Sequence, residues 1–415
     1  MVKGRITYFL GFLPTYVLRE IMELGSRGFP VDVFLPESDG TSDFWMDIIS
    51  DQEIDGTIAI RRDIRDHVAR CRPWRLTGFF LGRCLPVLFL HPFRFPRLAA
   101  ASIRVRSFRF FLLGASLSRR IRRDTLLIHS HFARSKAFTG MWAAKLLGIP
   151  FSVTTHAVDI FVPRREELVR YMLHEADSVL TISLFNRDYM ARRYGEYLRE
   201  KVRVTHLGLD QDSLPPRRSE TGSRPLVVCT ASGLGEKKGV PVLVEACRIL
   251  VSRGLSFGCR VIGSDMSGEL LERFRSQAVS SGLSGILEFT GKARSDEVLE
   301  CVAGADIFVL PSVRAANGDM DGIPVSLMES MSMGVPTVST SISGIPELVE
   351  NGVSGLLVTP GDPEELADAL ASLISDPLLA SKLGEAGMLK ARSGFSVSAY
   401  VTRLLESWPL SASRD

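Results

Sequence analysis

Short runs of apolar, β-branched residues alternate with amphipathic stretches along the whole chain. This alternation predicts parallel sheets built from strand–helix–strand units, because strands buried on both faces read as short continuous apolar runs. In the first half the pattern predicts strands at 5–10, 31–35, 56–60, 126–130, 151–155, 178–182 and 202–206. In the second half it predicts strands at 226–230, 258–263, 286–290, 306–310, 336–340 and 355–358.

A polar, proline-containing stretch without periodicity, residues 210–224, separates the two sets of strands. At 415 residues the chain also exceeds the size at which a single hydrophobic core stops growing. We therefore expect one α/β domain at 1–210 and a second at 225–395, joined by a linker. The remaining segment, 396–415, has helical spacing between about Val397 and Trp408.

Helix signals are clear in the second half. Apolar residues recur at spacings of three and four between 240 and 253, and Gly254 follows as a C-terminal stop. Asp362 is expected to cap a helix that begins at Pro363, with Glu365 completing a capping box.

The charge of the chain is unevenly distributed. The net charge is only +3, and no nucleic-acid recognition motif is present, so nucleic acid is not expected as a partner. Between Arg61 and Arg123, however, 16 arginines stand against two aspartates and are interleaved with aromatic residues such as Trp74 and Phe93. This composition is typical of contact with an anionic membrane, which we expect of residues 61–123. Ordinary helices with solvated arginines are the alternative.

Cysteine usage and hydropathy bear on the compartment. The six cysteines are scattered and form no Cys-x-x-Cys pair, which argues against a metal knuckle or a disulfide framework and favours a reducing cytoplasm. The most apolar stretch, 79–98, is interrupted by arginines and prolines and falls short of a membrane-spanning helix. We expect a cytoplasmic protein that lies at most on the inner face of the cell membrane.

The most informative segment for chemistry is 311–329. A predicted strand ends at Leu310, a polar loop with glycines follows, and a helix is predicted from about Pro324. Gly322 and Ile323 offer backbone amides at the start of that helix, and a helix N-terminus attracts anions such as a diphosphate.

Two acids, Asp321 and Glu329, stand eight positions apart around this turn, and Glu329 can accept hydrogen bonds from ribose hydroxyls. The spacing alone fits a capped surface helix with an incidental acid equally well. The stretch as a whole resembles the donor-site signature of the retaining family-4 glycosyltransferases, which have the GT-B fold. The similarity continues through 334–338, 344–349 and 351–358, covers roughly 126–395, and points to the branch that makes bacterial exopolysaccharides such as colanic acid.

The resemblance implies a GT-B fold, with two Rossmann-like parallel-sheet domains facing a cleft. It places the acceptor on the first domain and the nucleotide-sugar donor on the second, and it implies that 396–415 packs back on the first domain. The implied catalytic residues are His156, Lys238 and Asp321. The implied donor-binding residues are Gly263, Gly322, Ile323, Pro324, Val325 and Glu329.

His156 and Lys238 gain their roles from the resemblance. Lys238, in the run Glu236-Lys237-Lys238-Gly239, matches the donor-phosphate lysine, although a lone lysine before a helix is more often a solvated cation. His156 follows a predicted strand and matches a histidine that lies near the reacting sugar, although a lone histidine there is more often structural.

No metal and no separate cofactor are expected, because the nucleotide sugar is a substrate and the protein supplies the positive charge at the phosphate. His129 and His131 also resemble the family. We expect these two side chains to face opposite sides of their strand and so not to bind one metal together.

The sequence departs from the family pattern at two positions. Gly233 stands where an arginine usually precedes the lysine by five residues, and Asp321 replaces a glutamate. Glycine cannot replace a bidentate guanidinium donor at the leaving phosphate. We expect Arg314, on the loop before Asp321, to reach the diphosphate instead; a solvent-facing loop arginine is the alternative.

The expected function is transfer of a hexose from a nucleotide sugar, with a UDP-sugar as the expected donor, to a glycan or polyprenyl-diphosphate-linked acceptor with retention. The alternative from another class is a catalytically weakened homologue that binds a nucleotide sugar or a partner protein. A sugar-nucleotide epimerase fits the fold but not the run from 311 to 358. A dehydrogenase is disfavoured, because no Gly-x-Gly-x-x-Gly follows the first strand.

Overall fold

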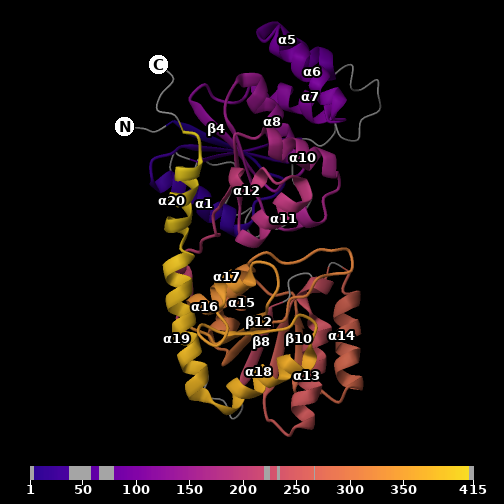
Figure 1. Cartoon of the computed structure of the whole chain (residues 1–415), viewed down its shortest axis with the longest axis vertical. Coiled ribbons are helices and arrows are strands. Elements are labelled where there is room, and N and C mark those ends of the chain that lie inside the picture. Colours follow the sequence, from indigo (N-terminus) through magenta and orange to yellow (C-terminus); the bar gives the residue numbers. More distant parts are fainter. Residues whose placement is uncertain are drawn as a thin grey trace. The chain divides into compact units, whose positions relative to one another are not determined.

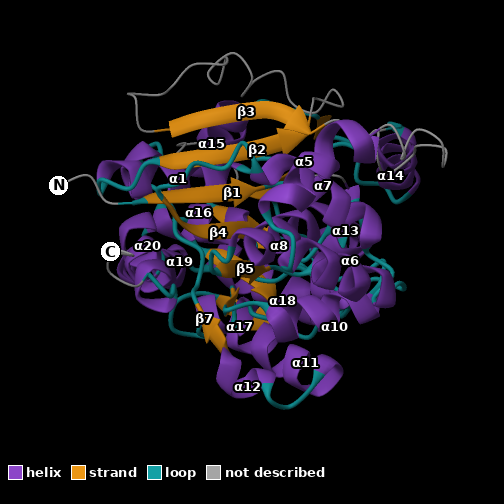
Figure 2. Ribbon diagram, turned by 90° about the horizontal axis from the view of Figure 1, so that it is seen from above, coloured by secondary structure: helices purple, strands orange, loops and turns teal. Residues whose placement is uncertain are grey.

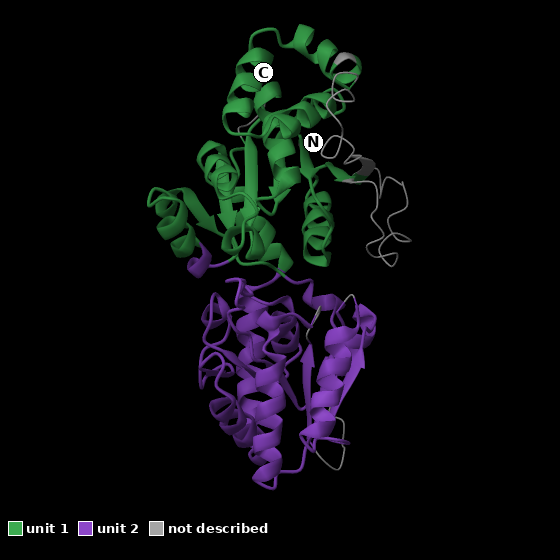
Figure 3. Cartoon of the chain, turned by 90° about the vertical axis from the view of Figure 1, so that its right-hand side faces the viewer, with its two compact units in different colours: residues 1–182, 187–208, 397–415 green, residues 183–186, 209–396 purple. Residues whose placement is uncertain are grey.

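A computed structural model describes residues 4–36, 58–64, 79–218, 225–230, 234–265 and 267–410. The chain divides into two compact units, each with its own parallel sheet (Figure 3). Unit 1 comprises residues 1–182, 187–208 and 397–415, and unit 2 comprises residues 183–186 and 209–396.

Unit 1 contains a seven-stranded parallel sheet with the order β3-β2-β1-β4-β5-β6-β7 (Figure 2). The chain thus runs outward from β1 on one side and outward from β4 on the other, which makes the β1–β4 boundary a topological switch point. The strands are β1 (Arg5–Phe9), β2 (Val31–Pro36), β3 (Ile58–Ile64), β4 (Thr125–His131), β5 (Phe151–Thr155), β6 (Ser178–Thr181) and β7 (Val202–Val204).

Helices of unit 1 cover this sheet. Helix α8 is buried almost all round, because it packs on β4 on one side and on α7 on the other. Gly114 of α7 permits this approach, since a Cβ atom there would lie 2.6 Å from the carbonyl oxygen of Thr139. The helices are α1 (Thr15–Ser26), η1 (Phe80–Cys84), α5 (Leu85–Leu90), α6 (Arg94–Arg104), α7 (Phe108–Ser118), α8 (Ser135–Leu147), α9 (Val158–Phe161), α10 (Glu166–Glu175), α11 (Leu184–Tyr194), α12 (Leu198–Lys201) and α20 (Val397–Ser407), with the start of α11 falling in unit 2.

Unit 2 contains a six-stranded parallel sheet with the order β10-β9-β8-β11-β12-β13. Its switch point lies between β8 and β11, the two central strands. The strands are β8 (Leu226–Thr230), β9 (Gly258–Ile262), β10 (Leu287–Gly291), β11 (Ile307–Leu310), β12 (Thr337–Thr340) and β13 (Leu356–Val358).

Most helices of unit 2 follow one of its strands along the chain, and Figure 1 labels α13 to α19 of this unit. They are η2 (Gln211–Ser213), η4 (Glu236–Lys238), α13 (Val240–Ser252), α14 (Glu269–Ser280), α15 (Ser295–Ala303), α16 (Val325–Ser332), α17 (Ile345–Leu348), α18 (Pro363–Ser375) and α19 (Pro377–Gly394).

Asp362 caps α18 as predicted, accepting hydrogen bonds from the amides of Glu364 and Glu365. The predicted capping box was wrong, because the Glu365 carboxylate accepts instead from the amide of Thr359.

The buried strands form the core of each unit, and all the strands predicted from the sequence are present. The side chains of β1, β5 and β11 are buried along their whole length, as expected of strands covered on both faces. The largest shift of a strand end is at β3, which continues to Ile64, four residues beyond its predicted end.

The last helix, α20, belongs to unit 1 and packs on α1. Tyr400 and Leu404 are buried in this contact, and the Arg27 guanidinium of α1 donates to the Thr402 hydroxyl at 2.8 Å. Within the residues that the structure describes, no helix is both long and apolar enough to cross a membrane.

Candidate active site

The loops after β8 and β11 meet at the switch point of unit 2. Parallel strands bring their carboxyl ends to one edge of a sheet, and ligands of open α/β sheets bind in the crevice at the switch point. The loop after β8 carries η4, with Lys237 and Lys238, and the loop after β11 carries Asp319 and Asp321. The Val313 amide donates to the Lys237 carbonyl at 2.9 Å, which joins the two loops directly.

Gly239 makes the close approach of these loops possible. Its φ of +65° lies in the left-handed region, and a Cβ atom at this position would lie 1.8 Å from the carbonyl oxygen of Pro311. Any other residue would therefore push the two loops apart. The glycine after the two lysines thus places both ammonium groups beside the loop of the acids.

Two lysines and two aspartates form a compact cluster at this point. The Lys238 ammonium donates to Asp321 Oδ2 at 2.8 Å. Lys237 Nζ lies 3.1 Å from Asp319 Oδ2 and 3.4 Å from Asp321 Oδ1. The buried hydroxyl of Ser312 adds a contact of 3.3 Å to Asp321 Oδ2. Asp321 is therefore held between two cations.

Burial alone would raise the pKa of Asp321, but the positive charges of Lys238 and Lys237, with their hydrogen bonds, lower it below its ordinary value. For Lys237, the attraction of Asp321 and Asp319 outweighs burial and raises the pKa. Asp321 and Lys237 are thus charged at neutral pH, and the Lys237 ammonium is a cation that an incoming diphosphate can contact.

Sequence reasoning singled out Lys238 and Asp321 and missed Lys237, Asp319 and Ser312. The signal for Lys237 was present, because two adjacent lysines precede a glycine in a short run. The sequence pattern alone does not predict the 3-10 turn of η4. This turn allows the side chains of Lys237 and Lys238 to reach the Asp321 carboxylate.

The helix that follows the acidic loop begins where the sequence predicts. Helix α16 starts at Val325 with Pro324 as its N-cap, and neither a capping side chain nor an acid occupies its first turn. Gly322 and Ile323 are buried just before it, and Glu329 is half-buried one turn further on. The uncapped amides at this end suit an anion.

The other predicted donor residues occupy different parts of the same edge. Gly263 directly follows β9 and its amide donates to the Gly291 carbonyl at 2.9 Å. Arg314 is exposed, and its guanidinium lies beside Gly318 of its own loop. Gly233 lies outside the described residues. The donor roles of Gly263 and Arg314 stay predictions.

In unit 1, His156 lies in a buried histidine cluster. Its ring stacks on Phe132 with centroids 4.2 Å apart, and its Nε2 lies 2.9 Å from Nδ1 of His131. Burial, and then the charge of His131, lower the pKa of His156 well below its ordinary value, so this histidine is neutral at neutral pH. Its amide donates to Asp159 Oδ1 at 3.1 Å.

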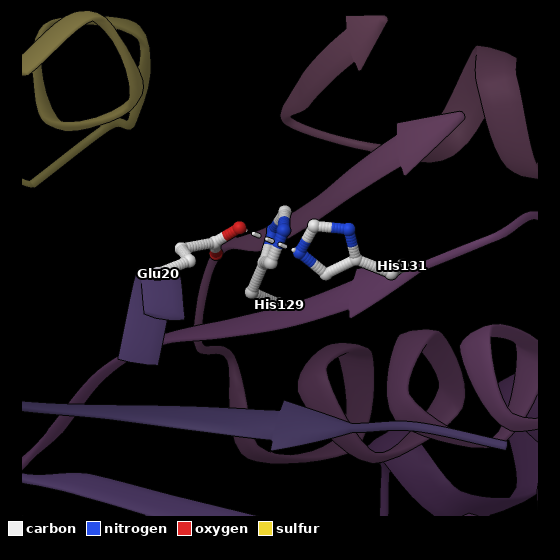
Figure 4. A group of neighbouring side chains, drawn as sticks. All are labelled: Glu20, His129 and His131. Carbon is white, nitrogen blue, oxygen red and sulfur yellow. Dashed lines mark ion pairs between the residues drawn. The ribbon is translucent and has the colours of Figure 1, made fainter. Parts of the chain in front are cut away.

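The expectation for His129 and His131 was wrong. Side chains alternate between the faces of a strand with a period of two, so positions 129 and 131 share a face. Their side chains meet Glu20 of α1, and all three are fully buried (Figure 4). One ligand atom from each residue lies within 4.8 Å of the others, so the group has the composition of a metal site.

A cavity of about 350 Å³ opens at the switch point of unit 1, beside this cluster. His131 and Phe132, at the end of β4, line it together with Arg134, Arg164 and Arg165. The three arginines are exposed, and none forms an ion pair with another residue in the described part of the chain. The cavity thus combines aromatic walls with positive charge.

Phe132 and Asp159 shape this cavity. Phe132 adopts a φ of +65°, which is uncommon for a residue other than glycine and is often found at functional sites. The buried Asp159 carboxylate accepts from the amides of Ala133 and His156, tying the loop after β4 to the loop after β5. Burial raises the pKa of Asp159 despite these hydrogen bonds.

Comparison with known proteins supports a single class of enzyme. Residues 13–213 match the family model of Glycosyltransferase Family 4, and residues 216–390 match the model of Glycosyl transferases group 1. A putative colanic acid biosynthesis glycosyltransferase, WcaL of Escherichia coli (strain K12), is 38% identical over 56% of this chain and 58% of its own length. The amylovoran biosynthesis glycosyltransferase AmsK of Erwinia amylovora is 40% identical over 42% of each chain. The match therefore spans less than two thirds of these relatives.

Solved structures resemble the chain over nearly its whole length. Sucrose-phosphate synthase from Thermosynechococcus elongatus has a TM-score of 0.74 at 17% identity, covering 97% of this chain and 98% of its own. Anabaena Alr3699/HepE, solved in complex with UDP and glucose, has a TM-score of 0.69 at 18% identity with the same coverage. These identities establish the fold alone. The expected fold class, two Rossmann-like α/β domains of the GT-B type, is confirmed.

Proposed function

Because the chain belongs to the family-4 and group 1 glycosyltransferases, we propose that it transfers a hexose from a nucleotide sugar to a glycan or lipid-linked glycan, with retention of configuration, in exopolysaccharide biosynthesis. The observation that carries this proposal is the cluster of Lys237, Lys238 and Asp321 at the switch point of unit 2. A UDP-sugar is the proposed donor.

The cluster suits the electronic demands of the reaction. As the bond between sugar and nucleotide breaks, negative charge grows on the β-phosphate, and preorganised cations and amides there stabilise the transition state. Lys238, Lys237 and the first amides of α16 would supply this field without a metal ion. Once the diphosphate engages the lysines, Asp321 is released to hold sugar hydroxyls.

The remaining donor contacts follow from the same arrangement. Glu329 would accept hydrogen bonds from the ribose, and Gly263, Gly322, Ile323, Pro324 and Val325 would border the diphosphate with their backbones. Arg314 would approach the phosphates in place of the arginine absent at 233. For His156 of unit 1, the resemblance implies a role near the reacting sugar. These roles rest on the resemblance of the motifs and on the positions described above.

The acceptor proposed for unit 1 is anionic and partly apolar. Arg134, Arg164 and Arg165 suit a phosphate or diphosphate, while Phe132 and Phe138 suit an apolar group. A polyprenyl-diphosphate-linked glycan combines both features. Two relatives are named for colanic acid and amylovoran biosynthesis, which supports a glycan acceptor of exopolysaccharide biosynthesis.

We also propose that unit 1 contacts the inner face of an anionic membrane. Phe89 and Leu90 at the end of α5, and Phe93 just before α6, expose 75%, 63% and 89% of their surface. Residues 79–123 contain ten arginines and no acidic residue, so these three exposed apolar side chains lie within a cationic segment. The part of the segment at 65–78, with Trp74, lies outside the described residues. Flotation with anionic vesicles, compared between wild type and Phe93→Ser, tests this contact.

A catalytically weakened homologue is not favoured, because family models match both halves of the chain and both lysines lie within contact distance of Asp321. The donor site is tested by calorimetric titration of UDP, GDP and their sugars into wild type and Glu329→Ala. Micromolar binding of one nucleotide that is lost in the variant supports the site. Binding of no nucleotide to the wild type overturns it.

A further inference from the structure

The carboxylate of Glu20 is buried where α1, β1 and α20 of unit 1 meet. Its Oε1 accepts a hydrogen bond from the Tyr8 hydroxyl of β1 at 2.5 Å, and its Oε2 accepts one from the Tyr400 hydroxyl of α20 at 2.8 Å. An ionised carboxylate offers about four lone pairs in total, so both oxygens can accept a further partner after these two bonds.

Two buried imidazole nitrogens beside this carboxylate have no hydrogen-bond partner among the residues that the structure describes. Nε2 of His131 lies 3.0 Å from Glu20 Oε2 but is not aligned for a hydrogen bond with it. Nδ1 of His129 has no hydrogen-bond partner either. A buried polar atom without a partner costs free energy that native structures normally avoid. These two nitrogens therefore point to a partner from outside the chain.

The second nitrogen of each imidazole ring already has a polar neighbour. Nδ1 of His131 lies 2.9 Å from Nε2 of His156, and Nε2 of His129 lies 3.3 Å from the hydroxyl of Thr154. Histidines that bind a metal are normally held by a hydrogen bond at the other ring nitrogen, and the carboxylates beside them are hydrogen-bonded too. The two rings and the Glu20 carboxylate are both held in this way, which is the surrounding that a metal site requires.

The three side chains are close enough to share one ion. One ligand atom from each of Glu20, His129 and His131 lies within 4.8 Å of the others (Figure 4). A tetrahedral divalent ion about 2.0–2.1 Å from each ligand holds two ligand atoms roughly 3.3 Å apart, so the 3.0 Å between Glu20 and His131 needs to open by only about 0.3 Å. Direct contact between Glu20 and His131 is the competing explanation, but it leaves Nδ1 of His129 without a partner.

We propose that Glu20, His129 and His131 bind one divalent transition metal ion, for which zinc is the best fit, and that this ion joins α1 to β4. Two imidazole nitrogens and a carboxylate oxygen are ligands that zinc prefers, whereas magnesium and calcium prefer oxygen ligands alone. The proposal is independent of the proposed transferase reaction, because the charge at the donor phosphate is supplied by lysines of unit 2.

The first test is the zinc content of the full chain without an affinity tag. The wild type is unfolded in urea with a chelator, refolded with or without zinc, and passed over a gel filtration column before elemental analysis. We expect about one zinc ion per chain. Free zinc at about 100 times its Kd should also raise Tm by about 5–10 °C, because an ion that binds only the folded state stabilises it. A folded chain that retains no zinc overturns the proposal.

The rate of zinc removal distinguishes the buried site from an ion at the surface. All three ligands are buried, so the ion can leave only when unit 1 opens. A chelator should therefore remove zinc slowly from the folded wild type and at once from the same protein in urea. Immediate removal from the folded protein indicates an ion at the surface and contradicts the proposal.

The ligands are identified with Glu20→Gln and His129→Gln, which should each lower the affinity for zinc at least about a hundredfold. Asp32→Asn is the matched control for a buried carboxylate of the same unit, since Asp32 lies 3.0 Å from Arg5. His174→Gln is the control for an exposed histidine. Both controls should bind zinc as the wild type does.

Zinc bound with unchanged affinity by both ligand variants would place the ion elsewhere and overturn the proposal, as would an equal loss in the two controls. If the ligand variants do not fold, the zinc content of the wild type and its rate of removal by the chelator still decide. None of these measurements uses sugar transfer, so a failure of the proposed function leaves the outcome for the metal site unchanged.

Discussion

The Lys238 ammonium lies 2.8 Å from Asp321 Oδ2, so the residue expected at the donor phosphate and the residue expected at the sugar hydroxyls contact each other. A diphosphate must compete with this carboxylate for the same cation. The pairing keeps the buried cluster electrically balanced. It also means that Asp321 competes with the phosphate for the Lys238 ammonium and is released when the donor binds.

Asp321→Asn tests this competition. Without the carboxylate, both lysines are available to phosphate, so the affinity for free UDP or GDP should rise by about tenfold, equivalent to about 1.4 kcal/mol. Sugar release should fall at the same time, because the amide cannot accept from sugar hydroxyls as a carboxylate does. Asp319→Asn is the control, since Asp319 contacts Lys237 but not Lys238. Weaker nucleotide binding in Asp321→Asn would refute the competition.

Gly239→Ala should destabilise unit 2. A Cβ atom would lie 1.8 Å from the Pro311 carbonyl, at a φ of +65°. We expect the free energy of unfolding to fall by at least about 2 kcal/mol. Gly235→Ala is the matched control on the same loop, because a Cβ there has no neighbour within 4 Å and its φ is −62°. Equal unfolding curves for the two variants in urea would show that the contact is not required.

Acid should destabilise unit 1 through its buried histidines. Burial, and then the charge of neighbouring histidines, lower the pKa of His129 and His156 well below the ordinary value of 6.5. Below pH 6.5 the unfolded chain protonates these two histidines, whereas the folded chain keeps them neutral. Their contribution to the free energy of unfolding is therefore fully present above that pH and is lost as the pH falls. Each histidine contributes a slope of at most about 1.4 kcal/mol per pH unit.

The measurement for this prediction is urea unfolding between pH 7.5 and 5. His129→Gln should show a shallower loss of stability with falling pH than wild type. His174→Gln should not, because the His174 side chain is 69% exposed. A wild-type stability that does not change over this range would contradict the assignment of neutral buried histidines.

The arginines of the unit 1 cavity should control acceptor binding. Replacing Arg164 and Arg165 together by alanine should raise KM for a polyprenyl-diphosphate-linked acceptor about tenfold, because hydrogen bonds to charged groups contribute about 1.5–3 kcal/mol. Donor hydrolysis without acceptor should not change. Arg199→Ala is the control, since this arginine pairs with Asp188 and Glu196 instead. An unchanged KM would exclude the cavity as the acceptor site.

Much of the fold could be predicted from the sequence, because parallel strands covered on both faces read as short apolar runs. The donor loop could also be predicted, since its strand, loop and helix follow each other within 311–329. Lys237 could not be assigned, because its contact with Asp321 depends on the turn of η4 and on a loop from another strand.

The histidine group of unit 1 shows a different limit. The alternation of side chains along β4 does place His129 and His131 on one face, so that signal was available in the sequence. The partners of these two histidines could not be predicted from the sequence. Glu20 lies on α1 and Tyr400 on α20, 380 positions apart, and only the folded unit brings them to one carboxylate.

The central claim is that the lysines at the switch point of unit 2 activate a nucleotide sugar. The most direct measurement is the rate of sugar transfer or release from the donor that binds, compared between wild type and Lys238→Ala. Lys390→Ala serves as a control, since Lys390 lies on α19 beside Glu350. We predict a rate about 10²–10³ lower in Lys238→Ala and an unchanged rate in the control. A rate in Lys238→Ala equal to that of the wild type would contradict the account.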